Sequence, residues 1–172
     1  MNKLINNNYC DSANYTGIVT VSVYNKETLV SSVTSHNTGM SKLFTFINSC
    51  LAGDFQAAKS SRPCKILLLK ESILSENNII STPVVYDRAA QATIEETGGS
   101  ISYHFRIPSL CLAVGEGNTV KELLLLPAMY TSLEKDTCAR FTLASPINLP
   151  EKSNNITIIV DWTLKFTNKE EN

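Results

Sequence analysis

The stretch Ile156-Thr157-Ile158-Ile159-Val160-Asp161-Trp162-Thr163-Leu164-Lys165-Phe166 decides the fold of this chain. Every second residue in it is apolar, and all but one of the residues between them are polar or charged. Because successive side chains of a strand point to opposite faces, this alternation predicts a long strand with one buried and one solvated face. The buried face carries the single tryptophan of the chain, which predicts a central core element. The expected core residues are Ile158, Val160, Trp162, Leu164 and Phe166.

Shorter segments of similar character lie upstream and predict further strands. Polar turns join two pairs of them into hairpins, one at Asn25–Glu27 and one at Gly98–Gly99. The apolar run Cys64–Leu69 indicates a strand covered on both faces, and Pro83 restricts Ile79–Tyr86 to an edge strand or an extended segment. Further strands are expected at residues 18–24, 28–34, 90–97, 100–107, 119–126 and 137–143. About eight strands joined by short turns predict a mainly β protein, an antiparallel β-sandwich.

The hydrophobic period changes near residues 39–52, where one short α-helix is predicted. The apolar positions have the spacing of a single helical face, which should pack against the sheets. They are Leu43, Phe44, Ile47 and Leu51. We expect Asn37 or Thr38 to cap the first turn, and Gly53 to end the helix in a left-handed conformation. A helical turn at Phe55–Lys59 is expected within the loop that follows.

The length of 172 residues fits one domain of ordinary size. We assign residues 1–15, which are polar and rich in asparagine, to an N-terminal arm that either frays or orders against a neighbouring subunit. Residues 16–168 are expected to form a single β-sandwich domain, and residues 169–172 a polar tail. No internal repeat or linker indicates a second domain.

Charge and cysteine content exclude several classes of function. The chain has 15 basic and 16 acidic residues, a formal net charge of -1, which disfavours direct binding of nucleic acid. No apolar run approaches the length of a membrane helix or of an export signal, so we expect no membrane association. The 5 cysteines are odd in number and widely spaced, which indicates reduced thiols in a protein made in a cytoplasm.

The sequence offers little catalytic equipment. His36 and His104 lie outside any recognisable motif, and no zinc site can be written from local spacing. Glu95 and Glu96 point to opposite faces of a strand, so they cannot converge as a catalytic acid and base. Asp161 is expected to lie alone on the exposed face of its strand. We therefore predict a protein that is not an enzyme, with no catalytic residue, metal or cofactor.

Two stretches of this chain follow a recurrent pattern. The first joins Thr119-Val120-Lys121-Glu122-Leu123-Leu124-Leu125-Leu126-Pro127, then Cys138-Ala139-Arg140-Phe141-Thr142-Leu143-Ala144-Ser145-Pro146-Ile147, and finally Ile158 to Asn168. The second is His36-Asn37-Thr38-Gly39, which leads into Leu43-Phe44-x-Phe46-Ile47 and Leu51-Ala52-Gly53-Asp54. Together they resemble structural proteins of tailed bacteriophage virions, particularly small virion proteins of crAss-like phages. The resemblance covers somewhat under half of the chain.

This resemblance implies a non-enzymatic virion component of the head, neck, collar or tail region. Such a protein is assembled in the cytoplasm of the bacterial host, contacts other virion proteins and forms a ring or another symmetric homo-oligomer. Within the first stretch, Glu122 lies in an otherwise apolar strand and Arg140 in the strand expected to face it. We hypothesise that a cross-strand pair of Glu122 and Arg140 fixes the register of these strands.

Two alternatives stay open at this point. One is a carbohydrate-binding or host-surface-binding module of a phage fibre, which should display exposed aromatic rings around a groove. Tyr130 follows Pro127 in a predicted loop and could serve there, whereas Tyr103 shares a strand face with Phe105 and is expected in the core. The other is a small hydrolase on a β scaffold, which should show a pocket with converging titratable groups.

Overall fold

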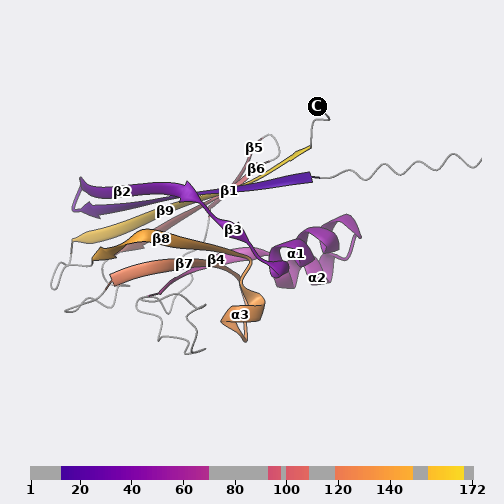
Figure 1. Ribbon diagram of the computed structural model, residues 1–172. Coiled ribbons are helices and arrows are strands. Elements are labelled where there is room, and N and C mark those ends of the chain that lie inside the picture. Colours follow the sequence, from indigo (N-terminus) through magenta and orange to yellow (C-terminus); the bar gives the residue numbers. More distant parts are fainter. Residues whose placement is uncertain (1–12, 70–92, 98–99, 109–118, 149–154, 169–172) are drawn as a thin grey trace, which may run out of the picture.

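Two antiparallel β-sheets face each other, and the helices gather at one end of the sandwich (Figure 1). This computed structural model describes residues 13–69, 93–97, 100–108, 119–148 and 155–168. Sheet A has five strands in the order β2-β1-β9-β6-β5, and sheet B has four in the order β3-β8-β7-β4. The strands are β1 (Ala13–Asn25), β2 (Thr28–His36), β3 (Thr38–Gly39), β4 (Pro63–Leu69), β5 (Thr93–Thr97), β6 (Ser100–Pro108), β7 (Thr119–Pro127), β8 (Ala139–Asn148) and β9 (Ile156–Asn168). The helices are α1 (Ser41–Leu51), α2 (Phe55–Ser61) and α3 (Leu133–Asp136). The predicted mainly β, antiparallel sandwich is confirmed.

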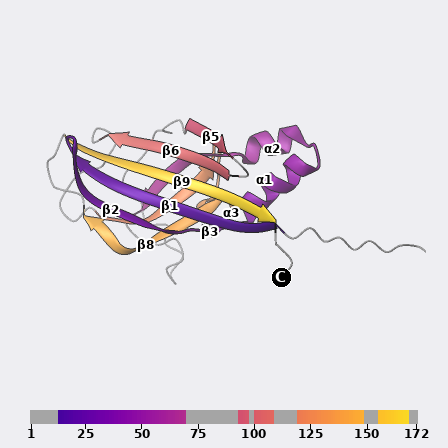
Figure 2. The same cartoon turned by 90° about the horizontal axis from the view of Figure 1, so that it is seen from above.

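Strand β9 lies at the centre of sheet A. It pairs antiparallel with β1 along its whole length on one side and with β6 on the other. Figure 2 shows β1 and β9 side by side along the sheet. The core face expected for β9 is buried at Ile158, Val160, Trp162 and Leu164, each at most 1% exposed. The side chain of Phe166 lies outside what the structure describes.

Apolar side chains fill the space between the sheets and also cover the outer face of part of sheet B. Ile66 and Leu68 of β4 belong to the main core between the sheets. The alternate residues of β4 and β7 join α3 in a second buried cluster, which comprises Leu67, Leu69, Leu124, Leu126 and Leu133. Since neighbouring residues of a strand point to opposite faces, β4 is buried on both sides, as the run Cys64–Leu69 predicts.

Helix α1 differs from its prediction in the face that it buries. Leu43 is buried in the main core, and Phe46 and Ile47 pack against that core. Phe44 and Leu51, which we expected to be buried, are 47% and 82% exposed. The prediction was therefore wrong at these two positions. The helix covers the end of the sandwich with a narrow stripe, so its flank and its last turn face outward.

The ends of the helices also depart in part from expectation. Neither Asn37 nor Thr38 caps α1, because the N-cap position is Met40, whose side chain makes no capping hydrogen bond. Gly53 ends α1 as predicted, with φ of 72°. The amide of Gly53 donates to Cys50 O and that of Asp54 to Ser49 O, the pair of bonds of a Schellman motif.

Helix α2 is longer than the single turn that we expected. Its N-cap is Asp54, whose side-chain oxygen accepts a hydrogen bond from the amide of Ala57 at 3.0 Å. Its buried residues are Ala58 and Ser61, two small side chains that produce no hydrophobic stripe in the sequence. The four-residue helix α3 was not predicted at all.

Several expectations concern segments outside the described residues. These are residues 1–12 of the arm, the predicted strand Ile79–Tyr86, the turn Gly98–Gly99 and the tail at 169–172. Strand β1 begins at Ala13, so residues 13–15, which we predicted to belong to the N-terminal arm, are part of sheet A.

The chain crosses from sheet A to sheet B at a corner built around Asn37. The Asn37 side-chain nitrogen donates to Gly17 O at 2.9 Å, and its oxygen accepts from the Tyr15 hydroxyl at 2.7 Å and from Trp162 Nε1 at 3.2 Å. This orientation of the amide gives each of its atoms a compatible partner. The buried indole N–H of Trp162 thus meets the hydrogen-bond acceptor that such a group requires. Asn37 therefore joins β1, β9 and the β2–β3 corner.

The cysteines of the described residues are free thiols that differ in burial. Cys50 is exposed, Cys64 is intermediate and Cys138 is buried. Burial raises the pKa of Cys138 to about 12 and also raises the pKa of Cys64. A thiol with such a high pKa forms little of the reactive thiolate, so Cys138 acts as a packing residue. Cys10 and Cys111 lie outside the described residues.

Candidate functional site

His104 of β6 and Asp161 of β9 form a pair on the outer face of sheet A. The two residues are opposite each other in the strand register, with 2.5 Å between His104 Nδ1 and Asp161 Oδ1. The expectation that Asp161 lies alone was wrong, because sequence order does not reveal which residue stands opposite it. In a hydrolase such a pair would orient a base toward a nucleophile. The neighbouring hydroxyls of Ser102 and Thr163 hydrogen-bond to each other at 3.0 Å, so we interpret this face as a set of cross-strand links.

The other residues that were candidates for a functional site from the sequence do not lie together in the structure. Tyr103 is buried in the core and stacks with Phe105, with 6.4 Å between the ring centroids. Tyr130 is partly exposed, and Lys65 Nζ lies 5.8 Å from the centroid of its ring. His36 is exposed at the end of β2. In the part of the chain that the structure describes, no three His, Cys, Asp or Glu side chains are grouped in a way that could hold a metal ion.

The helices of the described residues are all too short or too polar to cross a membrane.

The structure brings Glu122 of β7 and Arg140 of β8 together. Arg140 Nε lies 3.6 Å from Glu122 Oε1, and the Thr142 hydroxyl donates to the same oxygen at 3.0 Å. The two residues are diagonal neighbours, since Glu122 stands opposite Thr142 and Arg140 opposite Leu124. Glu122 is 0% exposed. A carboxylate that is shielded from water depends on such donors, so this pair links β7 and β8 within sheet B.

The helical end of the sandwich is held by bonds between segments that are distant in sequence. The amide of Met40 donates to Cys138 O at 2.9 Å, and that of Cys138 donates to Leu125 O at 2.8 Å. The Cys138 thiol lies 3.7 Å from Ser61 O at the end of α2. These contacts attach the start of α1 and the end of α2 to the strands of sheet B, so the helices have fixed positions.

Asp136, the last residue of α3, connects this helix to its own loop and to α1. Its Oδ2 accepts from the amides of Thr131 at 2.8 Å and Ser132 at 3.0 Å, and from the Thr131 hydroxyl at 3.2 Å. Its Oδ1 lies 3.5 Å from Lys42 Nζ of α1. The amide hydrogen bonds, together with the hydroxyl and the nearby ammonium group, lower the pKa of Asp136 from its ordinary value of 3.8.

We expect Asp136→Asn to destabilise the protein near neutral pH by about 1 kcal/mol, because a neutral amide accepts these hydrogen bonds more weakly. A carboxylate whose pKa is lowered by folding stabilises the native state above its unfolded pKa, and this contribution is lost as pH falls through the folded pKa. Urea unfolding should therefore show that the free energies of unfolding of wild type and variant differ less at pH 3 than at pH 7. An equal difference at both values would contradict the role of the ionised group.

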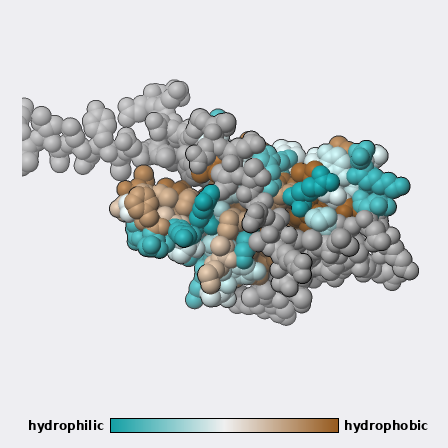
Figure 3. Space-filling model, turned by 180° about the vertical axis from the view of Figure 1, so that it is seen from behind, coloured by the Kyte–Doolittle hydropathy of each residue, from teal (hydrophilic) through white to brown (hydrophobic). Residues whose placement is uncertain are grey.

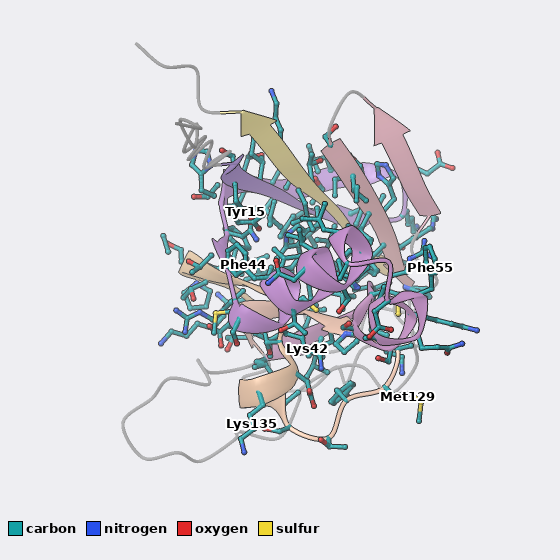
Figure 4. The ribbon with its side chains drawn as sticks, turned by 90° about the vertical axis from the view of Figure 1, so that its right-hand side faces the viewer. Tyr15, Lys42, Phe44, Phe55, Met129 and Lys135 are labelled. Carbon is teal, nitrogen blue, oxygen red and sulfur yellow. The ribbon has the colours of Figure 1, made fainter. Side chains whose placement is uncertain are left out.

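The same end of the molecule exposes large apolar side chains. Figure 4 looks onto this end, with Phe44 near Tyr15 on one side of the helices and Phe55 and Met129 on the other. Apolar colour gathers over the α1–α2 end when the molecule is seen from behind (Figure 3). We call the following residues the apolar end surface: Phe44 (47% exposed), Leu51 (82%), Phe55 (79%), Met129 (85%) and Tyr130 (39%).

The apolar end surface consists of three aromatic residues, a leucine and a methionine. Aromatic residues and methionine are enriched at protein–protein interfaces relative to the rest of protein surfaces. Single exposed apolar residues are normal on a protein surface, whereas large contiguous apolar patches mark interaction sites. The hydrogen bonds beneath α1, α2 and α3 fix the backbone that carries these side chains, which lowers the backbone entropy lost on binding.

The apolar end surface was not predicted from the sequence. The helical spacing predicts burial for Phe44 and Leu51. Phe55 falls in a helical turn predicted within a loop, and no pattern assigns a role to Met129. One signal was available: α1 has apolar residues on more of its circumference than a helix that packs on one side needs. That excess marks a second apolar face, which the sequence alone did not locate.

Comparison with protein-family models, with curated proteins and with solved structures finds no match for this chain.

Proposed function

We propose that this chain is a non-enzymatic structural subunit of a bacteriophage virion, which acts by assembling with copies of itself and with neighbouring virion proteins. The apolar end surface carries the assembly part of this proposal, since its exposed side chains are suited to burial against another protein. The virion part rests on the resemblance of β7, β8, β9 and the α1 segment to virion proteins.

The two stretches that carry the resemblance contact each other in sheet B. The stretch that begins at His36 forms β3 and α1, and the other forms β7, β8 and β9. β3 pairs with β8 through Thr38↔Arg140 and Gly39↔Ala139. The two stretches therefore meet in sheet B, where β3 pairs with β8, as expected of one structural unit.

The direct test is the composition of purified particles from a bacterial culture that produces the protein. Mass spectrometry of virions separated on a density gradient should find the chain among the particle proteins, in a fixed ratio to the major capsid protein. If the chain stays with the free host proteins and is missing from the particles, the proposed function is wrong.

A surface variant tests the apolar end surface itself. We expect the double variant Leu51→Glu/Phe55→Glu to leave the protein folded, because both side chains are about four-fifths exposed, and to reduce its incorporation into particles about tenfold or more. Gln56→Glu is the matched control, because it adds a negative charge to the exposed position of α2 next to Phe55. Equal incorporation of the double variant and the wild type would remove this surface from the assembly.

A further inference from the structure

The edge of sheet A formed by β2 is long, and among the described residues no strand pairs with its outer side. Eight of its nine residues are exposed, and only Val33 is intermediate. β2 contains no Lys, Arg, Asp, Glu or Pro, which are the residues that usually prevent pairing at sheet edges. Two of its exposed side chains, Leu29 (51%) and Val30 (61%), are apolar.

The other sheet edges in the described residues are less suited to pairing. β5 is five residues long and includes Glu95 and Glu96. β3 is two residues long. β4 begins with Pro63 and contains Lys65. Among these edges, β2 is therefore the one best suited to pairing with a further strand.

The pairing of β2 with β1 determines which backbone groups point outward. The amide of Asn37 donates to Gly17 O at 3.0 Å, and this pair continues the register of Ile18↔His36. Hydrogen-bonded and non-hydrogen-bonded pairs alternate in antiparallel sheets, so Ser31, Val33 and Ser35 direct their backbone groups toward β1. Ser32, Thr34 and His36 direct theirs toward the open edge.

Two side-chain contacts support this assignment. The hydroxyls of Thr20 and Thr34 are 2.8 Å apart, and those of Ser22 and Ser32 are 3.1 Å apart. Side chains approach more closely in non-hydrogen-bonded pairs, as the assignment requires for both contacts. The register shift between Val23 and Tyr24 leaves Val30 as an extra residue of β2, so regular pairing covers Ser31–His36.

We propose that two copies of this chain pair antiparallel through their β2 edges and join their five-stranded sheets into one continuous sheet. A two-fold axis gives each copy the donors and acceptors that the other needs, because both edges present the same alternation. An edge without charged side chains can meet itself without like-charge repulsion, whereas a charged partner strand would find no counter-charge. This pairing uses a different surface from the apolar end surface and does not depend on a role in virions.

The alternation also restricts how the two strands align. Outward-facing residues must stand opposite outward-facing residues, so one residue of β2 must stand opposite its own copy. An alignment centred on Val33 or Thr34 pairs five residues of the regular part, and one centred on Ser32 is symmetric over the whole strand Thr28–His36. These three alignments are the candidates. Pairing centred between two residues is excluded, because it would oppose an outward-facing residue to an inward-facing one.

Charge variants of the full chain test the pairing by analytical ultracentrifugation. The wild type should form a dimer, and Ser32→Lys/Thr34→Lys and Ser32→Glu/Thr34→Glu should each weaken self-association about a hundredfold or more, since like charges then meet in all three alignments. Mixing the two variants should restore a dimer that contains one copy of each. Restoration by mixing distinguishes lost pairing from misfolding. Leu51→Glu/Phe55→Glu serves as a control that should leave this dimer intact.

Cysteine substitution then gives the alignment. In a Cys50→Ser background, Ser32→Cys, Val33→Cys and Thr34→Cys should differ under mild oxidation, with a disulfide between identical residues at the central position. Peptide mapping would locate it. A wild-type chain that remains monomeric, or an oligomer that both charge variants leave unchanged, would overturn the proposal. The fate of the chain in particles tests the proposed function separately.

Discussion

Replacing Gly17 by alanine should destabilise this protein by about 3 kcal/mol, because it disrupts the corner around Asn37. A Cβ at Gly17 would overlap the Asn37 amide and lie 2.5 Å from the Tyr15 hydroxyl. The amide would have to move, and its hydrogen bonds to Gly17, Tyr15 and Trp162 would be lost or lengthened. Equilibrium unfolding in urea, followed by the fluorescence of Trp162, measures both the loss of stability and the change around the indole.

Gly53→Ala is the matched control for this experiment. A Cβ at Gly53 meets nothing within 4 Å, but φ of 72° makes an alanine there strained by about 1 kcal/mol. The two substitutions are chemically identical, so their difference isolates the steric conflict at the corner. If Gly17→Ala costs no more than Gly53→Ala, the corner does not depend on close contact with Asn37.

The second large effect is expected at the ion pair of sheet B. Arg140→Met should lower the free energy of unfolding by about 3 kcal/mol, because it removes the guanidinium from a Glu122 carboxylate that is 0% exposed. Thermal or urea unfolding of the variant measures this loss. The methionine keeps much of the volume of the arginine stem, so lost packing contributes little.

A double variant separates the pair from the individual residues. Glu122→Gln/Arg140→Met removes both charges and keeps an acceptor for the Thr142 hydroxyl. We expect it to recover most of the stability lost in Arg140→Met, to within about 1 kcal/mol of the wild type. A fully additive cycle, with no recovery in the double variant, would show that the carboxylate does not rely on Arg140.

The strands were the most predictable part of this fold, and the helical end the least. Alternation along Ile156–Phe166 is a local property of the sequence, and the burial of Val160 and Trp162 follows from it. The partner of Asp161 depends on the register of β6 against β9, which no local pattern contains. The same limit applies to Asn37, whose sequence context suits a helix cap. Its actual partners, Tyr15 and Trp162, come from two other strands.

The exposed face of α1 shows a different limit. The spacing of Leu43, Phe44, Ile47 and Leu51 fits a helical face, but it does not say how far the neighbouring sheets extend around the helix. Here the sandwich ends under α1, so Leu43 is covered and Leu51 is not. The candidate assembly surface follows from that tertiary arrangement. Strand β2 likewise becomes an edge of the sheet only because β1 pairs with it on one side and with β9 on the other.

The central position of β9 also determines the order in which sheet A can form during synthesis. The hairpins β1–β2 and β5–β6 can each form from nearby residues, but neither contacts the other in the strand order of the sheet. β9 leaves the ribosome after all of them and must insert between β1 and β6. Contacts between residues so distant in sequence form slowly. Until β9 pairs with β1 and β6, the facing edges of these two strands are open to other chains. The nascent chain is therefore most vulnerable to aggregation in the interval before its last strand emerges.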